Sequence, residues 1–409
     1  MCNSSVKVSV IMPSLNVGKY IAECIESAIN QTLKDIEIIC VDAGSTDGTL
    51  EILKEYEKKD SRVKVIVSDV KSYGRQINLG FAAATGQYMA ILETDDCIKP
   101  DMYEVLYNTA IETDADIVKT DFESFVDTED GRKYSYFSHF KDKSAYNKIF
   151  TPIHNPDSFS SNPSTWSSVY KMSFLKKNNI RHNETPGASY QDTSFWVLTL
   201  AAAKKAYFMD RAFYMLRRDR NESSVFNRGK IYAIFDEYNF IDENIPNDIK
   251  NDENYIKVYW KKKCDHFIYH YNRIADDSKL FYLCRMSEEF KKSYENNEID
   301  LSLLNKNRKK DIEDIILHPR EFYARADNQY NINAKKEKDN LEKEIRKIKK
   351  ENDKIKKEFT NVINSSSYKV GRIITFIPRK IRGGIRCLNQ NGIRYTIKRI
   401  ILKIKDKTH

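Results

Sequence analysis

The sequence predicts an α/β domain with a Rossmann-like, mostly parallel sheet, followed by a helical extension, a short coiled coil and a basic amphipathic tail. Three observations support this class. Buried strands alternate with amphipathic helical segments through residues 1–120, an order typical of parallel sheets with right-handed crossovers. Helical patterns continue through residues 226–334, and the composition shifts to Lys and Glu from residue 335.

The N-terminal elements place polar residues where a ligand site is expected. Apolar and β-branched runs predict strands at 6–12, 36–41, 63–67, 88–92 and 117–120, with helical spacing between them. Ligands of parallel sheets bind at the carboxyl ends of the strands. Pro13-Ser14, Asp42 and Asp95-Asp96 follow three of these strands, so we expect them to share one site.

The composition limits the classes of protein. Hydrophobic residues make up 41% of the 409 residues, which is enough for a core. The seven cysteines are irregularly spaced without a C-x-x-C pair, which indicates neither a disulfide framework nor a zinc site and fits a reducing compartment. The start of the chain lacks the apolar run of a secretory signal, and no stretch approaches 18 uninterrupted apolar residues. We therefore expect no spanning helix.

Residues 335–363 predict a coiled coil of about three heptads. Its apolar seam alternates in steps of four and three, through Leu341, Ile345, Ile348, Asn352, Ile355, Phe359 and Val362. Asn352 falls at a core position, where one polar residue commonly fixes the register of a dimer. The alternative is a lone, solvated, charged helix.

The positive charge is confined to the C-terminal part of the chain. Residues 331–409 carry 23 basic and 8 acidic residues, a net charge of +15, whereas residues 1–330 carry 45 basic and 51 acidic residues, a net charge of −6. This distribution disfavours nucleic acid as a partner. Two basic amphipathic stretches in residues 364–409 indicate an anionic membrane surface. Packing of this tail on the protein body or on a partner is the alternative.

Acidic residues carry the predicted chemistry. Asp95-Asp96, at the end of a strand, offers the carboxylate oxygens that Mn²⁺ and Mg²⁺ prefer, and such a cation neutralises the charge that develops on a departing diphosphate. Asp192 lies among aromatic residues in SYQDTSFW, a setting that suits a sugar-binding cleft, and a carboxylate there can act as a general base. An N-cap or surface role for Asp192 is the ordinary alternative.

Four motifs in order resemble the family 2 glycosyltransferases. The segments are VSVIMPSLNVGKY, then VDAGSTDGT, then NLGFAAATG and ETDD, and the later NNIRHNETPGASYQDTSFW is similar to the stretch that carries the catalytic E-D motif. The resemblance covers about residues 5–225. It implies a GT-A fold, with a nucleotide-sugar-binding half at 1–120 and an acceptor-binding half at 121–225.

The resemblance also implies roles for individual residues. Pro13 and Ser14 would line a uridine pocket, and Asp42 would bond the uracil edge, which favours a UDP-sugar as donor. Asp95 would approach the ribose or the phosphates, and Asp96 would bind Mn²⁺ or Mg²⁺.

Asp192 would be the general base of an inverting single displacement onto a hydroxyl of a glycan or lipid-linked acceptor. The implied setting is polysaccharide or glycolipid assembly in the cytoplasm, peripheral to the inner face of the cell membrane.

The sequence departs from the family pattern at four positions. Leu15 replaces a frequent aromatic residue, Ala43 replaces the second Asp of D-D-G-S, and Glu93 replaces the first Asp of D-x-D-D. Gln191 replaces the Glu that usually precedes the base, which puts the acceptor contacts in doubt more than the chemistry.

Several further residues are assigned to the ligands by position. Lys71, Arg75 and Asn78 are expected near the nucleotide, since a cation there can reach a phosphate; solvated charges are the alternative. Four residues are expected near the acceptor or the diphosphate, namely Trp166, Gln191, Arg217 and Arg218. For Trp166, core packing is an equal alternative.

Three other classes of protein compete with this interpretation. A nicotinamide oxidoreductase would show G-x-G-x-x-G after the first strand, where this chain has PSLNVG. A nucleotidyltransferase would show a glycine-rich basic loop there. A non-catalytic assembly protein, with the coiled coil and tail as its working parts and a relic front domain, is the strongest alternative. The intact Asp95, Asp96 and Asp192 argue against it.

Overall fold

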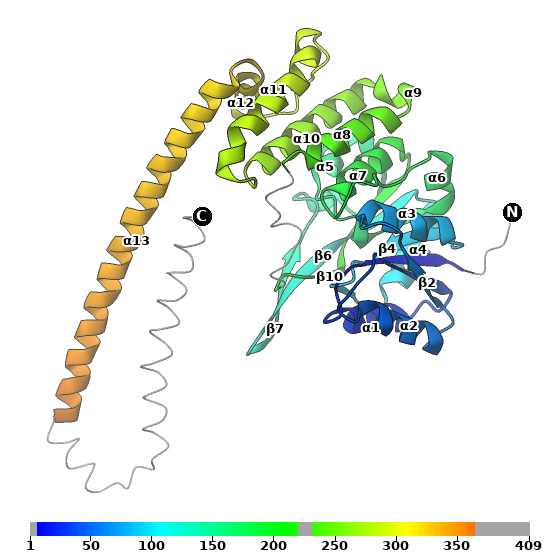
Figure 1. The fold of residues 1–409 in the computed structure, drawn as a ribbon, viewed down its shortest axis with the longest axis horizontal. Coiled ribbons are helices and arrows are strands. Elements are labelled where there is room, and N and C mark those ends of the chain that lie inside the picture. The colour runs from blue at the N-terminus through cyan, green and yellow to red at the C-terminus, as the bar shows by residue number, and fades with distance from the viewer. Residues whose placement is uncertain (1–5, 220–230, 365–409) are drawn as a thin grey trace, which may run out of the picture. The chain divides into compact units, whose positions relative to one another are not determined.

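The computed structural model describes residues 6–219 and 231–364 and divides the chain into two units, 1–325 and 326–409. The first unit contains the sheet and helices α1–α12 (Figure 1). Its strands are β1 (Val8–Ser14), β2 (Ile36–Asp42), β3 (Val63–Val67), β4 (Tyr88–Ile91), β5 (Cys97–Ile98), β6 (Ile117–Thr128), β7 (Gly131–Phe137), β8 (Ile149–Phe150), β9 (Ser168–Lys171) and β10 (Ala206–Arg217).

Helices cover the sheet and extend beyond it. Those within the first 205 residues are α1 (Ile21–Ile29), α2 (Thr49–Lys59), α3 (Tyr73–Ala83), α4 (Met102–Thr113), α5 (Pro156–Ser160), α6 (Met172–Lys177) and α7 (Gln191–Ala202). The helical extension consists of α8 (Ala233–Asn244), α9 (Asn247–Lys250), α10 (Glu253–Tyr271), α11 (Lys279–Glu295) and α12 (Lys306–Leu317).

The main path of the sheet runs β3-β2-β1-β4-β9-β6-β10-β5. β1 pairs in parallel with β2 and β4, β2 with β3, and β6 with β10. The antiparallel β9 joins the two parallel groups by pairing with β4 and β6. The predicted α/β class, with a mostly parallel sheet and a helical C-terminal part, is confirmed. β9 has no counterpart in the prediction, because residues 121–225 show no regular pattern.

β1 continues through Pro13, where the prediction ended it. Pro13 and Ser14 pair with Val41 and Asp42 of β2, whereas the pairing of β1 with β4 stops at Ile11. Because the β4 side of the ladder has already ended, the missing N–H of proline is tolerated near the end of a central strand.

Alternate residues along the strands pack into two hydrophobic cores. Val10 and Met12 point into a core with α1, α2 and α4. Ile11 packs into the other core, which contains residues of α3 and α7 and continues through α8, α10, α11 and α12. In Figure 1, α8 and α10 lie on the α7 side of the sheet. The helical extension therefore shares its core with one face of the sheet.

The predicted coiled-coil segment lies within one long helix, α13 (Pro319–Asn364). Of the seam residues, Ile348 is 41% exposed and Ile355 is 62% exposed, so an apolar stripe is accessible on this helix. No helix in the described part of the chain has the length and apolar content needed to cross a bilayer. The predicted basic tail lies almost wholly outside the described residues.

Candidate active site

The carboxyl ends of β1, β2 and β4 meet at one edge of the sheet. Ser14 and Asp42, the last residues of β1 and β2, are paired, and the Ser14 carbonyl accepts a 3.0 Å hydrogen bond from the Ala43 amide. Beyond β4, the Thr94 hydroxyl donates to the Pro13 carbonyl at 2.8 Å. The three polar clusters singled out in the sequence therefore lie close together.

Gln76 of α3 fastens two of these strand ends. Its Nε2 donates to the Ser14 carbonyl at 2.8 Å and to the Val41 carbonyl at 2.6 Å, and the side chain is buried. Buried carbonyls at the end of a ladder need such partners. Sequence reasoning missed Gln76, because one glutamine near a helix start carries no pattern of its own.

The Asp42 side chain stabilises the turn that follows β2. Its buried carboxylate accepts hydrogen bonds from the Gly44 and Ser45 amides, both at 2.9 Å, and from the Ser45 hydroxyl at 2.5 Å. The Ser14 hydroxyl beside it is buried and has no hydrogen-bond partner in the described part of the chain. Since such a group costs about 1–3 kcal/mol when it stays unsatisfied, Ser14 is well placed to receive a bond from a ligand.

Lys71 lies near the same turn. Its Cε is 4.0 Å from the position that a Cβ on Gly44 would occupy, and the residue is exposed. This placement brings a cationic side chain toward the strand ends that carry Ser14 and Asp42.

The acidic segment after β4 is anchored to β10. Asp96 is 2% exposed, and its two oxygens accept hydrogen bonds from the Tyr214 hydroxyl at 2.8 Å and from the Arg217 amide at 2.7 Å. Asp95 is only partly buried. Asp95 is thus the more accessible carboxylate of the pair, and Asp96 is the one that β10 fixes in place.

The charges of this segment suit a divalent cation. Burial, followed by the neighbouring Asp95, raises the pKa of Asp96 well above its usual range. A cation would relieve the repulsion between the two carboxylates, and Mn²⁺ and Mg²⁺ accept such oxygens. The described residues contain no cluster of three or more His, Cys, Asp or Glu side chains suited to a metal. By charge and by ligand type, Asp95 and Asp96 would fit such a cation.

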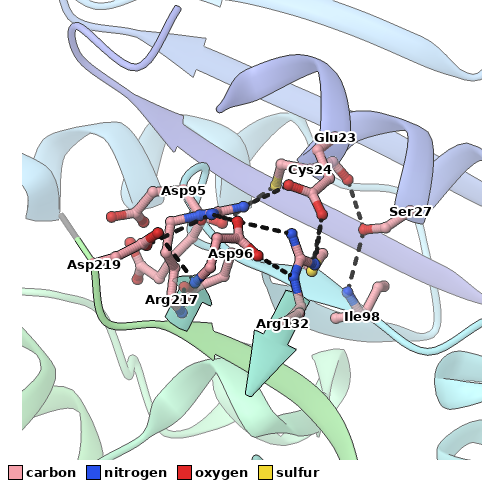
Figure 2. Close-up of polar contacts among 12 residues, drawn as sticks. Glu23, Cys24, Ser27, Asp95, Asp96, Ile98, Arg132, Arg217 and Asp219 are labelled. Carbon is pink, nitrogen blue, oxygen red and sulfur yellow. Dashed lines mark hydrogen bonds and ion pairs between the residues drawn. The ribbon is translucent and has the colours of Figure 1, made fainter. Parts of the chain in front are cut away.

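Arg217 binds the acidic segment through its side chain (Figure 2). Its Nε donates to the Asp95 carbonyl at 3.0 Å, and its two terminal nitrogens bind Glu23 at 2.5 Å and Asp127 at 2.9 Å. The side chain is 8% exposed. The guanidinium is engaged with groups inside the protein, and its expected contact with an acceptor or diphosphate stays a prediction.

Two other residues from the same prediction lie nearby. Arg218 donates its amide to the Phe125 carbonyl at 2.8 Å, and the residue is exposed. Trp166 is partly buried and stacks on Tyr214, with 4.1 Å between ring centroids. Because Tyr214 bonds to Asp96, Trp166 borders the acidic segment.

Asn78 and Arg75 hold the segment that leads toward α7. The Asn78 side chain donates to the His182 carbonyl and to Glu184, both at 2.9 Å, and accepts from the His182 amide at 3.0 Å. Arg75 pairs with Asp69 at 3.2 Å and with Glu184 at 3.7 Å. Both residues bind protein partners in this structure, and their expected nucleotide contacts stay predictions.

The start of α3 packs tightly against the same segment. A Cβ on Gly74 would lie 1.8 Å from the Asn183 carbonyl oxygen, so only glycine fits there. The Gly187 amide donates to the Lys71 carbonyl at 2.7 Å, and the Tyr73 amide donates to the Gly187 carbonyl at 2.9 Å. These contacts link the residues near the strand ends to the segment that leads into the first turn of α7.

Asp192 is the second residue of α7 and is partly buried. Burial raises its pKa to about 6. The Asp192 charge helps to raise the pKa of Tyr73, whose hydroxyl donates to Glu93 at 2.6 Å. Asp192 therefore lies near the Tyr73–Glu93 bridge, and with a pKa of about 6 it is ionised at neutral pH while remaining a better proton acceptor than an exposed aspartate.

Gln191 shapes the loop in front of α7. Its Nε2 donates to the Thr185 hydroxyl at 2.8 Å and to the Gly187 carbonyl at 3.1 Å, and its Oε1 accepts from the Ser189 amide at 2.5 Å. The side chain is 2% exposed. The amide group is used within the loop, and the expected acceptor contact of Gln191 stays a prediction.

Comparisons with known proteins show which family and relatives the chain resembles. Residues 9–177 match the family model described as Glycosyl transferase family 2. The chain is 41% identical over 130 residues to the glycosyltransferase GlyG of Streptococcus pneumoniae serotype 4, covering 32% of this chain and 43% of the relative. It is 31% identical over 225 residues to the cholesterol galactosyltransferase of Borreliella burgdorferi, covering 51% and 59%.

A solved structure shows the same fold. Staphylococcus aureus TarS 1–349 in complex with UDP-GlcNAc matches with a TM-score of 0.56 and 19% identity, over 69% of this chain and 80% of that chain. Against the first four curated relatives, the matched region spans between 33% and 62% of their length.

Proposed function

We propose that the chain is an inverting glycosyltransferase that moves a sugar from a UDP-sugar to a hydroxyl of a glycan or lipid-linked acceptor. The proposal starts from the match of residues 9–177 to the model of glycosyl transferase family 2. The observation that carries this proposal is the position of Asp192. Its charge acts on Tyr73, and Tyr73 bonds to Glu93 of the acidic segment. The proposed base and the proposed diphosphate site are thereby linked by one electrostatic interaction and one hydrogen bond.

The donor nucleotide is assigned to the ends of β1 and β2. The unpartnered Ser14 hydroxyl and the nearby Lys71 supply groups for the nucleotide and its phosphates. Asp42 shapes this pocket through its turn and retains lone pairs that can accept from a uracil N–H. The TarS complex supports a uridine donor, because a relative of this fold binds UDP-GlcNAc.

Asp95 and Asp96 are the residues that would hold Mn²⁺ or Mg²⁺ together with the diphosphate. When bound, the cation neutralises the charge of the leaving UDP. Asp95 offers the more exposed carboxylate, while Asp96 stays fixed by Tyr214 and by the Arg217 amide. The chain thus presents one accessible and one immobile carboxylate to the same ligand.

Asp192 takes the proton of the attacking hydroxyl. The acceptor oxygen forms a bond to the anomeric carbon as the bond from that carbon to the UDP oxygen breaks, and the proton passes to the Asp192 carboxylate. Attack from the face opposite UDP inverts the configuration, so an α-linked donor gives a β-linked product. Such proton transfer by a positioned side chain contributes about 10²- to 10⁴-fold to the rate.

Two features outside the sheet suggest where the chain works. The accessible stripe on α13 would pair with a second copy as a coiled coil, and the basic charge of residues 364–409 would bind an anionic membrane surface at the inner face of the cell membrane. Both assignments belong to this proposal.

The test is UDP release by the purified protein with Mn²⁺ and a panel of UDP-glucose, UDP-galactose, UDP-GlcNAc, UDP-GalNAc and UDP-glucuronic acid. Release from one or two sugars that is lost in Asp192→Asn and Asp96→Ala supports the proposal. If no sugar is turned over and neither UDP nor Mn²⁺ binds by calorimetry, the glycosyltransferase proposal fails. The non-catalytic assembly protein would then be the leading interpretation.

A further inference from the structure

The helical extension contacts the beginning of α7 on both sides of Asp192. Glu237 of α8 is 0% exposed, and one of its oxygens accepts a hydrogen bond from the Ser194 hydroxyl. His270 of α10 lies 2.8 Å through Nδ1 from the Tyr190 hydroxyl. Tyr190 and Ser194 are each two residues from Asp192, so both contacts act on the turn that carries it.

Glu237 also reaches the segment packed against α3. Its other oxygen accepts a hydrogen bond from Asn183 Nδ2 at 3.1 Å, and the Asn183 carbonyl fills the space beside Gly74. One buried side chain therefore connects α7 with the segment next to Tyr73. A buried carboxyl group with two partners has few alternative positions, because leaving either bond unmade is unfavourable.

Charges of the extension act on the same turn. Burial, and less strongly the charge of Asp192, raises the pKa of Glu237 to about 8. Lys262 of α10, whose Nζ donates to the Ser161 carbonyl at 2.8 Å, lowers the pKa of Asp192. The other titratable groups that respond to Asp192 are three tyrosines, Tyr73, Tyr170 and Tyr190.

We propose that Glu237 is a positioning residue for Asp192: by bonding Ser194 and Asn183 together, it holds the first turn of α7 against the segment that borders α3. The helical extension is then part of the catalytic unit. This inference rests on the proposed role of Asp192 as the base. The matched family region ends at residue 177, so it contains neither Glu237 nor the turn that Glu237 holds.

Hydrogen exchange measured on the full chain tests the positioning directly and without substrate. In Glu237→Ala, amides of residues 190–196 should exchange at least about tenfold faster, while those of α1 serve as an internal reference. Glu237→Gln keeps one acceptor and one donor and should restore slow exchange. Glu243→Gln, at an exposed position of the same helix, is the matched control. Unchanged exchange at 190–196 in Glu237→Ala overturns the proposal.

Kinetics of the same variants test the consequence for catalysis. Glu237→Ala should lower kcat at least about tenfold and leave the KM for the UDP-sugar within about twofold, because the base, and not the donor site, is displaced. The acidic limb of its pH profile should move from near pH 6 toward lower pH, as water reaches Asp192. If Glu237→Ala has the same kcat and the same acidic limb of the pH profile as the wild type, the inference is overturned.

Two results separate this inference from the proposed function. If the wild type turns over no UDP-sugar and binds neither UDP nor Mn²⁺, but Glu237→Ala still accelerates exchange at 190–196, the positioning contact stands and the glycosyltransferase proposal falls. If Glu237→Ala does not fold, Ser194→Ala removes the same bond from the α7 side and replaces it in both measurements, with the same expected results.

Discussion

The backbone amide of Arg217 donates to the Asp96 carboxylate at 2.7 Å, although 121 residues separate the two in the chain. The Arg217 side chain reinforces this contact through the Asp95 carbonyl and through Glu23 of α1. Figure 2 shows Arg217 beside Asp95 and Asp96, with a dashed line from its side chain to Glu23. The last residue of β10 therefore fixes the Asp96 carboxylate and the backbone of Asp95.

Replacing Arg217 should loosen this arrangement. Arg217→Gln leaves Glu23 and Asp127 without their buried partner, and we expect a loss of about 2 kcal/mol in the free energy of unfolding, below the value for a fully buried pair because both carboxylates are partly exposed. Urea unfolding measures it, and calorimetry should show weaker UDP–Mn²⁺ binding. Arg218→Gln, at the adjacent exposed position, is the control. Equal effects of the two substitutions would contradict the assignment.

Asp192→Asn should remove turnover and preserve donor binding. We expect kcat to fall about 10²- to 10⁴-fold with the Kd of UDP unchanged, since only the proton acceptor is lost. In the wild type, kcat should fall as the pH drops below about 6, where Asp192 becomes protonated. A variant that keeps its activity would remove Asp192 from the mechanism.

The same substitution should stabilise the fold near neutral pH. Because burial raises the folded-state pKa of Asp192 above its unfolded value, the wild type loses stability as the pH rises through about 4 to 6. Asp192→Asn has no carboxylate to ionise and therefore does not lose this stability. Its unfolding temperature should equal that of the wild type at pH 4 and exceed it at pH 7.5. An advantage that is the same at both pH values would argue against a raised pKa.

Cation binding should strengthen with pH. The raised pKa of Asp96 means that a proton competes with Mn²⁺ for the site. We expect the affinity of the UDP–Mn²⁺ pair to increase from pH 6 to pH 8, with proton release detected by calorimetry in buffers of different ionisation enthalpy. Asp96→Asn should abolish both effects. Affinity that is independent of pH in the wild type would contradict this account.

Gly74 should tolerate no side chain. A Cβ there would lie 1.8 Å from the Asn183 carbonyl oxygen, so Gly74→Ala must displace the segment before α7, at a cost of about 1–3 kcal/mol. Reduced stability and kcat are expected together. Ala82→Ser, at an exposed position of the same helix, should change stability by less than about 0.5 kcal/mol. A fully stable Gly74→Ala protein would disprove the close approach.

Truncation tests the proposed membrane and dimer contacts. Removal of residues 366–409 should leave turnover in solution intact and abolish binding to anionic liposomes, because the basic amphipathic stretches lie there. Light scattering of the full-length chain should give a dimer, and Ile355→Asp on the α13 stripe should give a monomer. Liposome binding after truncation, or a monomeric wild type, would contradict the respective proposal.

The sequence predicts the front of the sheet well, because its strands are continuous and apolar. The range 63–67 agrees residue for residue with β3, and the range 36–41 is one residue shorter than β2. β9 and β10 were beyond prediction, since their short or polar-interrupted patterns depend on neighbours brought from far along the chain. Local periodicity does not record such partners.

The site was predictable in its residues more than in their roles. Motif spacing leads to Ser14, Asp96 and Asp192, and the structure brings their elements to one edge of the sheet. Motif spacing does not reveal that the side-chain amides of Asn78 and Gln191 form hydrogen bonds that hold loops, because a side-chain amide can bind a ligand or a buried backbone group equally well. Only the folded partners decide between these uses.

The place of β10 in the sheet has a consequence for synthesis on the ribosome. β10 inserts between β6 and β5, and it brings Tyr214 and the Arg217 amide to Asp96. When a nascent chain has emerged only as far as residue 177, the whole matched family region is outside the exit tunnel, but neither of these two partners of its acidic segment is. The acidic segment therefore gains its β10 partners late, when residue 217 leaves the tunnel.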